Sequence, residues 1–476
     1  MSRAQAILTT LVAYNALVVA MGLWAARRTH DESDFFLGGR RLGAWVAGIS
    51  ASASSSSAWT LLGVSGAAYA WGLSALWLFP AILGGFLINW IWVAPRLMRM
   101  SRERGSLTLT EFLAGDPAER LYPATIRFCS AVILVAFMFY IASQFQAAGL
   151  AFSASFGLSP TLSIILGAAI ILAYTLLGGF WAVSATDVLQ GGLMLAAALV
   201  LPVAALSALG GFGELADGLR TASGSGASLT GDYPGVLGLA FVMGTLGIGL
   251  GYPGQPHVVN RFMALRDERA LSQGRAISLA WAVIIYSGML LIGLSARVMW
   301  SELPDGEQVI FHAANATLPP VLAGLMVAAV LSAIMSTSDS QLLVASASVT
   351  WDLDRASRRP VADTARRGLL VSRVVVVVLS LLAMLLAIFA PAAIFSRVLF
   401  AWHALGSAFG PVLLVRLAGY RMDARGALAS IVAGFGLTVF FYLMPDTPGD
   451  WMERLIPLLA ALAIALLARR GREKTT

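Results

Sequence analysis

The sequence predicts an all-α polytopic membrane protein, and two observations carry this prediction. Of the 476 residues, 58% are hydrophobic and only 12% are charged, whereas about a quarter of the residues of a soluble domain are charged. The apolar residues also fall into runs of about 20, each long enough to cross a bilayer core of roughly 30 Å as a helix. The composition therefore excludes an ordinary soluble protein.

The hydropathy pattern predicts about 13 transmembrane helices in one membrane domain that comprises residues 1–476. The expected spans are 5–26, 43–72, 74–95, 124–152, 159–178, 182–208, 235–259, 275–300, 318–350, 369–389, 392–417, 426–444 and 452–468. Arg27 and Arg28 follow the first span, where a cleavage site would carry small residues. We therefore expect this span to be retained as a helix.

The segments between the spans alternate in charge. The arginine-rich ones are 27–41, 96–104, 261–275, 355–367, 416–425 and 469–474, whereas the intervening ones carry acids such as Glu214, Asp305 and Asp446. The positive-inside rule then places the N-terminus outside and the C-terminus in the cytoplasm of a multi-pass membrane protein. The net charge of +7 indicates no nucleic-acid partner, because the basic residues punctuate apolar runs that lie in the lipid bilayer.

Two of the expected spans contain residues that a continuous helix does not favour. The second carries four consecutive serines, which compete for backbone hydrogen bonds, so we expect a break near Ala53 to Ser57. The seventh holds five glycines and two prolines between Gly244 and Pro256 and should break too. Close helix packing through small residues is the alternative explanation, but it accounts for neither the serine run nor the two prolines.

The two interrupted spans are five positions apart, as two inverted five-helix repeats would place them. The expected repeats are 43–208 and 235–417. Residues 5–26 then form an extra N-terminal helix, and residues 426–468 form two extra C-terminal helices. This arrangement is typical of secondary transporters.

Three ionisable residues stand deep inside expected spans: Asp187, Asp339 and His403. Such positions are costly and indicate function. Around Asp339, helical spacing puts Ser336 and either Asp339 or Ser340 on one face. Free carbonyls of broken helices, hydroxyls and a carboxylate are suitable ligands for a monovalent alkali cation. His403 is either a hydrogen-bonded packing residue or a pocket group.

No catalytic or nucleotide-binding motif occurs in the sequence. It lacks a Walker motif, a nucleophile elbow and a His-Glu-x-x-His pair, and its one cysteine, Cys129, excludes an intramolecular disulfide and a cysteine-based zinc site. We therefore expect a transporter driven by an ion gradient, and no enzyme.

Several segments resemble one known family. They are FFLGGRRLG at 35–43, SASASSSSAW at 50–59, GGFWAVSATD at 178–187, GYPGQPH at 251–257, MST at 335–337 and AFGP at 408–411. In this order and spacing they resemble the sodium:solute symporter family, and within it the bacterial sodium/proline symporters. The resemblance implies a leucine-transporter-like fold with 13 spans, an outside N-terminus, and sodium as the coupling ion. It also implies a multi-pass protein of the bacterial inner (plasma) membrane.

The resemblance also implies a set of ligands. The principal sodium site would be formed by Ala53, Ser56, Ala333, Ser336 and Thr337. A second site, for a sodium ion or a proton, would be formed by Asp187, Ser336, Asp339 and Ser340. The substrate would contact Ser57, Trp59, Tyr140, Tyr252, Gln255 and Pro256, with His403 facing the same region.

This chain departs from its apparent relatives at three positions. Asp339 stands where a serine is usual, Ser55 where the proline symporters carry an aspartate, and Ile248 where a tryptophan is expected. The expected function is sodium-coupled import of a small zwitterion, with L-proline favoured. The alternative is a proton-coupled symporter, or one selective for another zwitterion or a carboxylate. A transporter-like membrane sensor is a remote third hypothesis, because it would need a soluble signalling domain.

Overall fold

The computed structural model describes residues 2–26, 37–176, 180–221, 227–356 and 365–472. Phe35, Phe36, Gly178 and Gly179 of the quoted motifs, and parts of three arginine-rich segments, lie outside the described residues. The α-helices are α1 (Arg3–Ala26), α3 (Ala44–Ser55), α4 (Val64–Trp71), α5 (Leu78–Leu87), α6 (Ala94–Glu103), α7 (Leu109–Ala114), α8 (Tyr122–Phe156), α9 (Pro160–Thr175), α10 (Phe180–Leu209), α11 (Phe212–Thr221), α12 (Gly235–Gly247), α13 (Pro256–Ala264), α14 (Glu268–Met299), α15 (Val309–Thr317), α16 (Pro320–Ala347), α17 (Leu353–Ala356), α18 (Ala365–Phe389), α19 (Ile394–Leu417), α20 (Ala424–Tyr442) and α21 (Trp451–Leu467). Short 3-10 and π segments are η1 (Gly38–Arg40), η2 (Trp59–Gly63), η3 (Gly72–Trp77), η4 (Ile88–Val93), η6 (Ile248–Gly254), η7 (Gly306–Gln308), η8 (Ser348–Asp352) and η9 (Pro448–Asp450).

Ten helical stretches among the described residues are long and apolar enough to cross a membrane. Ten of the expected spans correspond to them. Of the other three, the span 43–72 is divided into two parts. Its first part is α3, and its second part, η2 and α4, continues into α5 and α6 as one stretch, Trp59–Glu103. That stretch reverses at Gly72, whose φ of 62° favours glycine. Helices α9 and α21 have only 16 and 17 residues.

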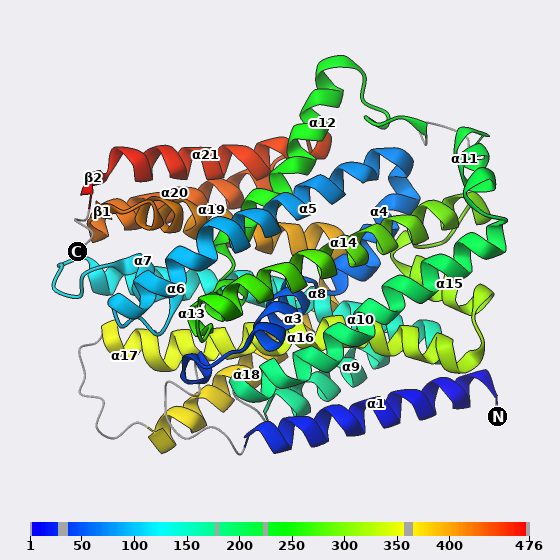
Figure 1. Ribbon diagram of the computed structural model, residues 1–476, viewed down its shortest axis with the longest axis horizontal. Coiled ribbons are helices and arrows are strands. Elements are labelled where there is room, and N and C mark those ends of the chain that lie inside the picture. The colour runs from blue at the N-terminus through cyan, green and yellow to red at the C-terminus, as the bar shows by residue number, and fades with distance from the viewer. Residues whose placement is uncertain (1, 27–36, 177–179, 222–226, 357–364, 473–476) are drawn as a thin grey trace.

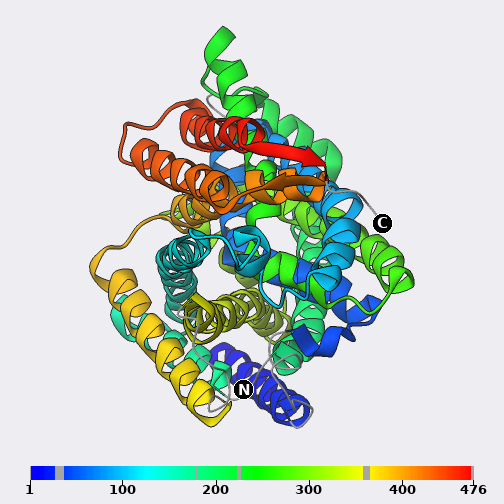
Figure 2. The ribbon, with the colours of Figure 1, turned by 90° about the vertical axis from the view of Figure 1, so that its left-hand side faces the viewer.

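Most helices run along the long axis of the molecule (Figure 1). Helices α6, α7, α13 and α17 lie at one end of this axis, together with the arginine-rich ends of the described chain, whereas α11 and α15 lie at the other end beside the N-terminus. Seen along the axis, α1 and α18 lie at one edge of the bundle and α20 and α21 lie near the opposite edge (Figure 2). The described arginine-rich segments thus share one end, as expected from their alternation.

The centre of the bundle is formed by α16 and α19. Burial covers 83% of the apolar window of the α16 stretch and 94% of that of α19, but only 33% of those of α1 and α18. Helix α16 begins with Pro320 in its first turn, where a missing N–H costs no hydrogen bond. Its hydroxyl cluster is therefore held inside protein rather than facing lipid.

Two helices continue beyond their expected spans. Helix α6 extends past residue 95 to Glu103 because its sequence is amphipathic: Leu97, Met98 and Met100 are buried, while Arg99 is exposed. Helix α14 begins before residue 275, where Asp267 caps it by accepting a hydrogen bond from the Ala270 amide at 2.7 Å. Charged turns thus extend both helices at the arginine-rich end.

The described residues also include a small β-ribbon that the all-α prediction did not contain. Strand β1 (Tyr420–Met422) pairs antiparallel with β2 (Arg469–Arg472), with Tyr420 opposite Arg472. Arg470 donates to Asp423 at 2.6 Å. The ribbon ties the chain after α21 to the turn before α20.

Candidate functional site

The first interrupted helix breaks where the serine run predicts. Helix α3 ends at Ser55, and Ser56 has φ −112° and ψ 83°, outside the helical region. The Ser55 hydroxyl donates back to the Ser52 carbonyl at 2.9 Å, as serines in a helix tend to do. The Gln144 side chain accepts the Ala58 amide at 3.0 Å, so α8 satisfies one backbone donor that the break leaves free.

The second interrupted helix is also confirmed. After α12 the chain tightens into η6 and then extends at Gln255, with φ −88° and ψ 102°, before α13 starts at Pro256. The Gln255 amide donates to the carbonyls of Gly251 and Trp402, at 3.0 and 2.8 Å. This side chain therefore holds the break against α19.

The residues expected at the principal sodium site come together between α3 and α16. The Ser336 hydroxyl lies 3.2 Å from the carbonyls of both Ala53 and Ala333. The Thr337 hydroxyl donates to the Ser54 carbonyl at 3.2 Å. Two hydroxyls of α16 therefore face backbone carbonyls in the last turn of α3, where the helix ends.

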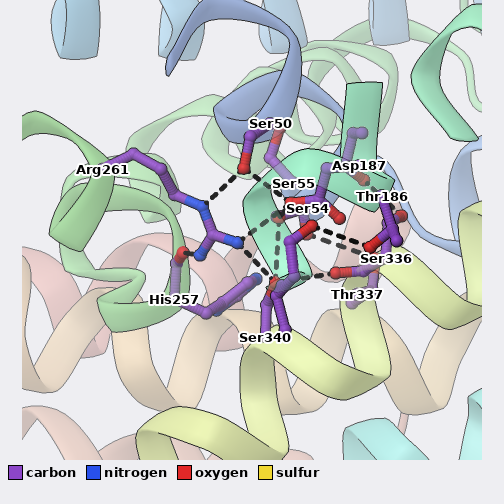
Figure 3. Close-up of polar contacts among 12 residues, drawn as sticks. Ser50, Ser54, Ser55, Thr186, Asp187, His257, Arg261, Ser336, Thr337 and Ser340 are labelled. Carbon is purple, nitrogen blue, oxygen red and sulfur yellow. Dashed lines mark hydrogen bonds and ion pairs between the residues drawn. The ribbon is translucent and has the colours of Figure 1, made fainter. Parts of the chain in front are cut away.

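The second cluster contains a cation that the sequence did not lead us to expect. The Asp187 carboxylate accepts hydrogen bonds from Ser50 at 2.6 Å and Ser54 at 3.2 Å. Arg261 of α13 pairs with the same carboxylate at 3.2 Å, donates to Ser50 at 3.1 Å and to Ser340 at 2.5 Å, and has its guanidinium between α3 and α16 (Figure 3). Arg261 and Asp187 are 1% and 0% exposed, so this ion pair is fully buried.

Asp339 differs from Asp187 in its surroundings. It is fully buried on α16, and neither carboxylate oxygen has a hydrogen-bond partner among the described residues. Two helical turns away, Ser332 donates to the Tyr14 hydroxyl of α1 at 2.8 Å. On α10, both amide atoms of Gln190 are also buried without partners within the described chain. This region offers oxygen ligands that the protein itself does not satisfy.

Tyr286 of α14 lies between the two breaks and contacts one of the expected substrate residues, Tyr252. The Tyr286 hydroxyl lies 3.1 Å from the hydroxyls of Ser56 and Thr60, and 3.4 Å from that of Tyr252. Tyr140 donates to Ser57 at 3.2 Å. The two breaks are therefore connected through hydroxyl groups and lie close together.

Trp59 and His403 have different neighbours. The Trp59 ring packs against Phe395 at 5.5 Å. On α19, Trp402 supplies the contact with Tyr252, with ring centroids 4.6 Å apart. His403 is fully buried, and neither of its ring nitrogens has a partner among the described residues. Its part in substrate binding stays a prediction.

Glu307, in the loop after α14, fixes the start of α19 beside Phe395. Its carboxylate accepts the backbone amides of Ile394 and Phe395, at 3.1 and 2.8 Å. Burial raises the pKa of Glu307, and the two amide hydrogen bonds oppose that rise. An acid of an expected loop thus positions the aromatic ring that contacts Trp59.

Sequence reasoning missed three contributors to this site: Arg261, Tyr286 and Gln144. Arg261 was assigned to an arginine-rich connection, whereas α13 carries it into the interior. Tyr286 and Gln144 are polar side chains inside otherwise apolar spans. That exception to the apolar pattern is the signal that would have found them.

Comparison with known proteins identifies relatives along most of the chain. The model of a family described as the sodium:solute symporter family matches residues 35–434. The chain is 33% identical to a high-affinity proline transporter of Bacillus subtilis over 461 residues, 94% of each protein. It is 35% identical to the sodium/proline symporter of Escherichia coli over 447 residues, which cover 91% of this chain and 87% of the other.

Solved structures share the fold. A sodium-coupled sialic acid symporter in a substrate-bound outward-open state aligns with a TM-score of 0.79 at 20% identity, over 98% of this chain and 99% of the other. A nucleobase-cation-symport-1 family transporter aligns with a TM-score of 0.55 at 15% identity, over 92% and 95% of the two chains. At these identities the likeness establishes the fold alone, that of a mostly helical membrane protein.

Proposed function

Because the chain belongs to the sodium:solute symporter family, we propose that it is a sodium-coupled symporter that imports L-proline by alternating access. Relatives at 33% and 35% identity that are named as proline transporters support this substrate. The observation that carries the proposal is the meeting of Ser336 and Thr337 with the backbone carbonyls of the first break. Such a group of neutral oxygens is suited to a sodium ion.

The proposal includes a finer architecture. Thirteen spans cross the plasma membrane of a bacterial cell, the N-terminus is outside, and the arginine-rich end faces the cytoplasm. Residues 1–476 form one transporter domain, in which 43–208 and 235–417 are inverted repeats, 5–26 is an added N-terminal helix and 426–468 are two added C-terminal helices. The two interrupted helices, five spans apart, support this division.

In the proposed ion site, sodium binds the carbonyls of Ala53, Ser56 and Ala333 and the hydroxyls of Ser336 and Thr337. The two hydroxyls now donate to backbone carbonyls. A bound cation would rotate their protons away and take their lone pairs, because a hydroxyl both donates and accepts. Sodium would thereby hold α3 and α16 together at the break.

The proposed substrate site lies at the two breaks and is lined by Ser57, Trp59, Tyr140, Tyr252, Gln255, Pro256 and His403. The helical segment that restarts at Ala58 directs its positive end at the break and attracts the proline carboxylate. Helix α13, which restarts at Pro256, presents a second positive end to the other break. One of these two helix ends holds the carboxylate, and the aromatic rings enclose the apolar part of proline.

Uptake of labelled L-proline into proteoliposomes tests the function when sodium and proton gradients are imposed separately. We expect an inward sodium gradient to drive accumulation and a proton gradient alone to drive none. Accumulation under a proton gradient without sodium would replace the proposal by the proton-coupled alternative. Absence of labelled proline uptake under a sodium gradient that drives accumulation of another labelled zwitterion or a carboxylate would replace the substrate.

Asp339→Asn is expected to weaken sodium activation of uptake while leaving the pH profile nearly unchanged. The buried carboxylate without a protein partner supports a second ion site with Asp187, Ser336 and Ser340, and neighbouring hydroxyls complete an oxygen shell that a proton would not need. Uptake measured across sodium concentrations and pH values checks this. If the variant instead flattens the pH dependence and leaves sodium activation intact, the second site binds a proton.

Ser338→Ala is the matched control for this variant. Ser338 adjoins Asp339 on α16, is fully buried, and has no hydrogen-bond partner for its hydroxyl among the described residues. Its variant should behave as the unmodified protein in both titrations. Unchanged behaviour of Asp339→Asn in both titrations would remove Asp339 from ion coupling.

Truncation of Trp59, Tyr140 or Tyr252 should weaken proline binding by about 1–3 kcal/mol each, the transfer free energy of a buried side chain. Proline binding in saturating sodium, measured by calorimetry, checks this. Phe139→Ala is the control, because Phe139 adjoins Tyr140 on α8 but packs on Phe400 at 5.2 Å. Unaltered affinity in all three variants would place the substrate elsewhere.

A further inference from the structure

A basic cavity lies at the arginine-rich end of the molecule, away from the breaks. It has a volume of about 800 Å³ and opens between α6 and the start of α14. Five arginines line it: Arg96, Arg99, Arg102, Arg266 and Arg275. Three acids, Glu103, Asp267 and Glu268, also line it, so the lining carries an excess of positive charge.

Two of the acids are already engaged. Asp267 caps α14 through the Ala270 amide and pairs with Arg266 at 2.8 Å. Glu103 lies 3.8 Å from Arg99 in an exposed pair. Glu103 thus pairs with Arg99, and Asp267 pairs with Arg266. The other three arginines of the lining are Arg96, Arg102 and Arg275.

Arg96 and Arg275 keep their charge available. The Arg96 guanidinium lies 4.6 Å from the centroid of the Trp92 ring and donates to the Trp92 carbonyl at 3.0 Å, so its contacts are with a neutral residue. Arg275 has neither an ion pair nor a hydrogen bond with any residue that the structure describes. Arg102 also contacts neutral groups, but the two carbonyls that it binds, of Leu265 and Arg266, hold its guanidinium against the start of α14. Arg96 and Arg275 are therefore the cations best placed to receive an external anion.

Apolar side chains flank this charge. Ile91, on the turn before Arg96, is 51% exposed, and Trp45, in the first turn of α3, is 68% exposed. Trp45 follows Ala44, whose carbonyl lies against Gly274, the residue before Arg275. Exposed tryptophan next to arginine at the end of a transmembrane helix is typical of the membrane interface.

We propose that this cavity binds the headgroup of an anionic phospholipid, with Arg96 and Arg275 contacting its phosphate. Basic pockets between helices at the membrane boundary recognise such headgroups, and guanidinium groups match phosphate oxygens in geometry. The acyl chains lie against the exposed apolar surface of Ile91 and Trp45. A free phosphate would use only the charge, so the apolar flank favours the lipid. This proposal does not depend on the transported substrate.

The test compares the purified full chain with R96Q/R275Q and with a matched control, R120Q/R421Q. Arg120, in the turn after α7, and Arg421, on β1, are exposed. Helix α7 and strand β1 lie at this same end of the molecule (Figure 1), and both double variants lose equal charge. Binding of phosphatidylglycerol is measured by native mass spectrometry. The thermal unfolding midpoint in neutral detergent is measured with phosphatidylglycerol, with phosphatidylcholine, and with potassium phosphate.

Phosphatidylglycerol should bind the unmodified chain and the control equally, and raise their unfolding midpoints more than phosphatidylcholine does. Its affinity for R96Q/R275Q should be lower by roughly tenfold or more, since each arginine near a surface contributes about 1 kcal/mol. Equal losses in both double variants would overturn the proposal in favour of general surface charge. Stabilisation by potassium phosphate equal to that by the lipid would overturn it in favour of a free-anion site. Absence of any phosphatidylglycerol effect on the unmodified chain would overturn it as well.

Discussion

Replacing Arg261 with methionine should destabilise the protein by about 3–5 kcal/mol, the usual cost of leaving one charge of a buried ion pair without its partner. The Asp187 carboxylate would keep its hydrogen bonds from two serine hydroxyls. It would lose the guanidinium that balances its negative charge in the interior of the protein. Asp187→Asn should cost a similar amount by the same argument. The double variant should recover much of the loss, because neither charge then remains unpaired. Thermal unfolding of all three variants in detergent checks these expectations.

The exposed pair of Arg99 and Glu103 provides the control. Its atoms are 3.8 Å apart with side chains 66% and 63% exposed, so Arg99→Met should change stability by less than about 1 kcal/mol. Added sodium chloride should stabilise Arg261→Met more than potassium chloride does if Asp187 accepts sodium in the absence of the guanidinium. Equal stability of Arg261→Met and the unmodified protein would contradict a structural role for the pair.

Removal of the hydroxyl of Ser336 or Thr337 should raise the sodium concentration for half-maximal uptake by roughly tenfold or more. A contact between a hydroxyl and a charged group contributes about 1.5–3 kcal/mol, and each residue supplies one of five proposed ligands. Proline affinity in saturating sodium should change much less. Initial rates of uptake across a sodium series, for Ser336→Ala and Thr337→Val, measure the effect.

Ser332→Ala is the matched control on the same helix. Its hydroxyl contacts Tyr14 and the Ala328 carbonyl, each at 2.8 Å, so its loss leaves the carbonyls of the break untouched. Sodium activation should remain normal in this variant. If both site variants show normal sodium activation, the ion does not bind between α3 and α16.

Local composition predicted the features that local chemistry determines. Four consecutive serines interrupt α3 and two prolines accompany the end of η6, because each of these residues weakens helical hydrogen bonding at its own position. The approach of Ser336 to Ala53 followed from the resemblance of several motifs in a fixed order. Both kinds of prediction rest on short stretches of sequence.

Long-range pairing escaped the sequence reasoning. The sequence around Arg261 indicates a basic connecting segment. Its partner Asp187 lies 74 positions earlier, and no local pattern links the two residues. The same holds for Tyr286, whose partner Ser56 is 230 positions away. The extension of α6 past residue 95 was missed because hydropathy falls where arginines begin, although Leu97, Met98 and Met100 continue the buried face.

The Tyr286 hydroxyl connects the two breaks, and this has a thermodynamic consequence. It lies within reach of Ser56 and Thr60 on the first interrupted helix and of Tyr252 on the second, yet a phenol has a single proton to donate. If a bound ligand makes Tyr286 donate its hydrogen bond to one interrupted helix, the other interrupted helix loses that hydrogen bond. Linkage makes such an effect reciprocal: whatever factor sodium applies to the affinity for the amino acid, the amino acid must apply to the affinity for sodium. In the proposed symporter, the single proton of Tyr286 is therefore one physical link between the binding of sodium and the binding of the amino acid.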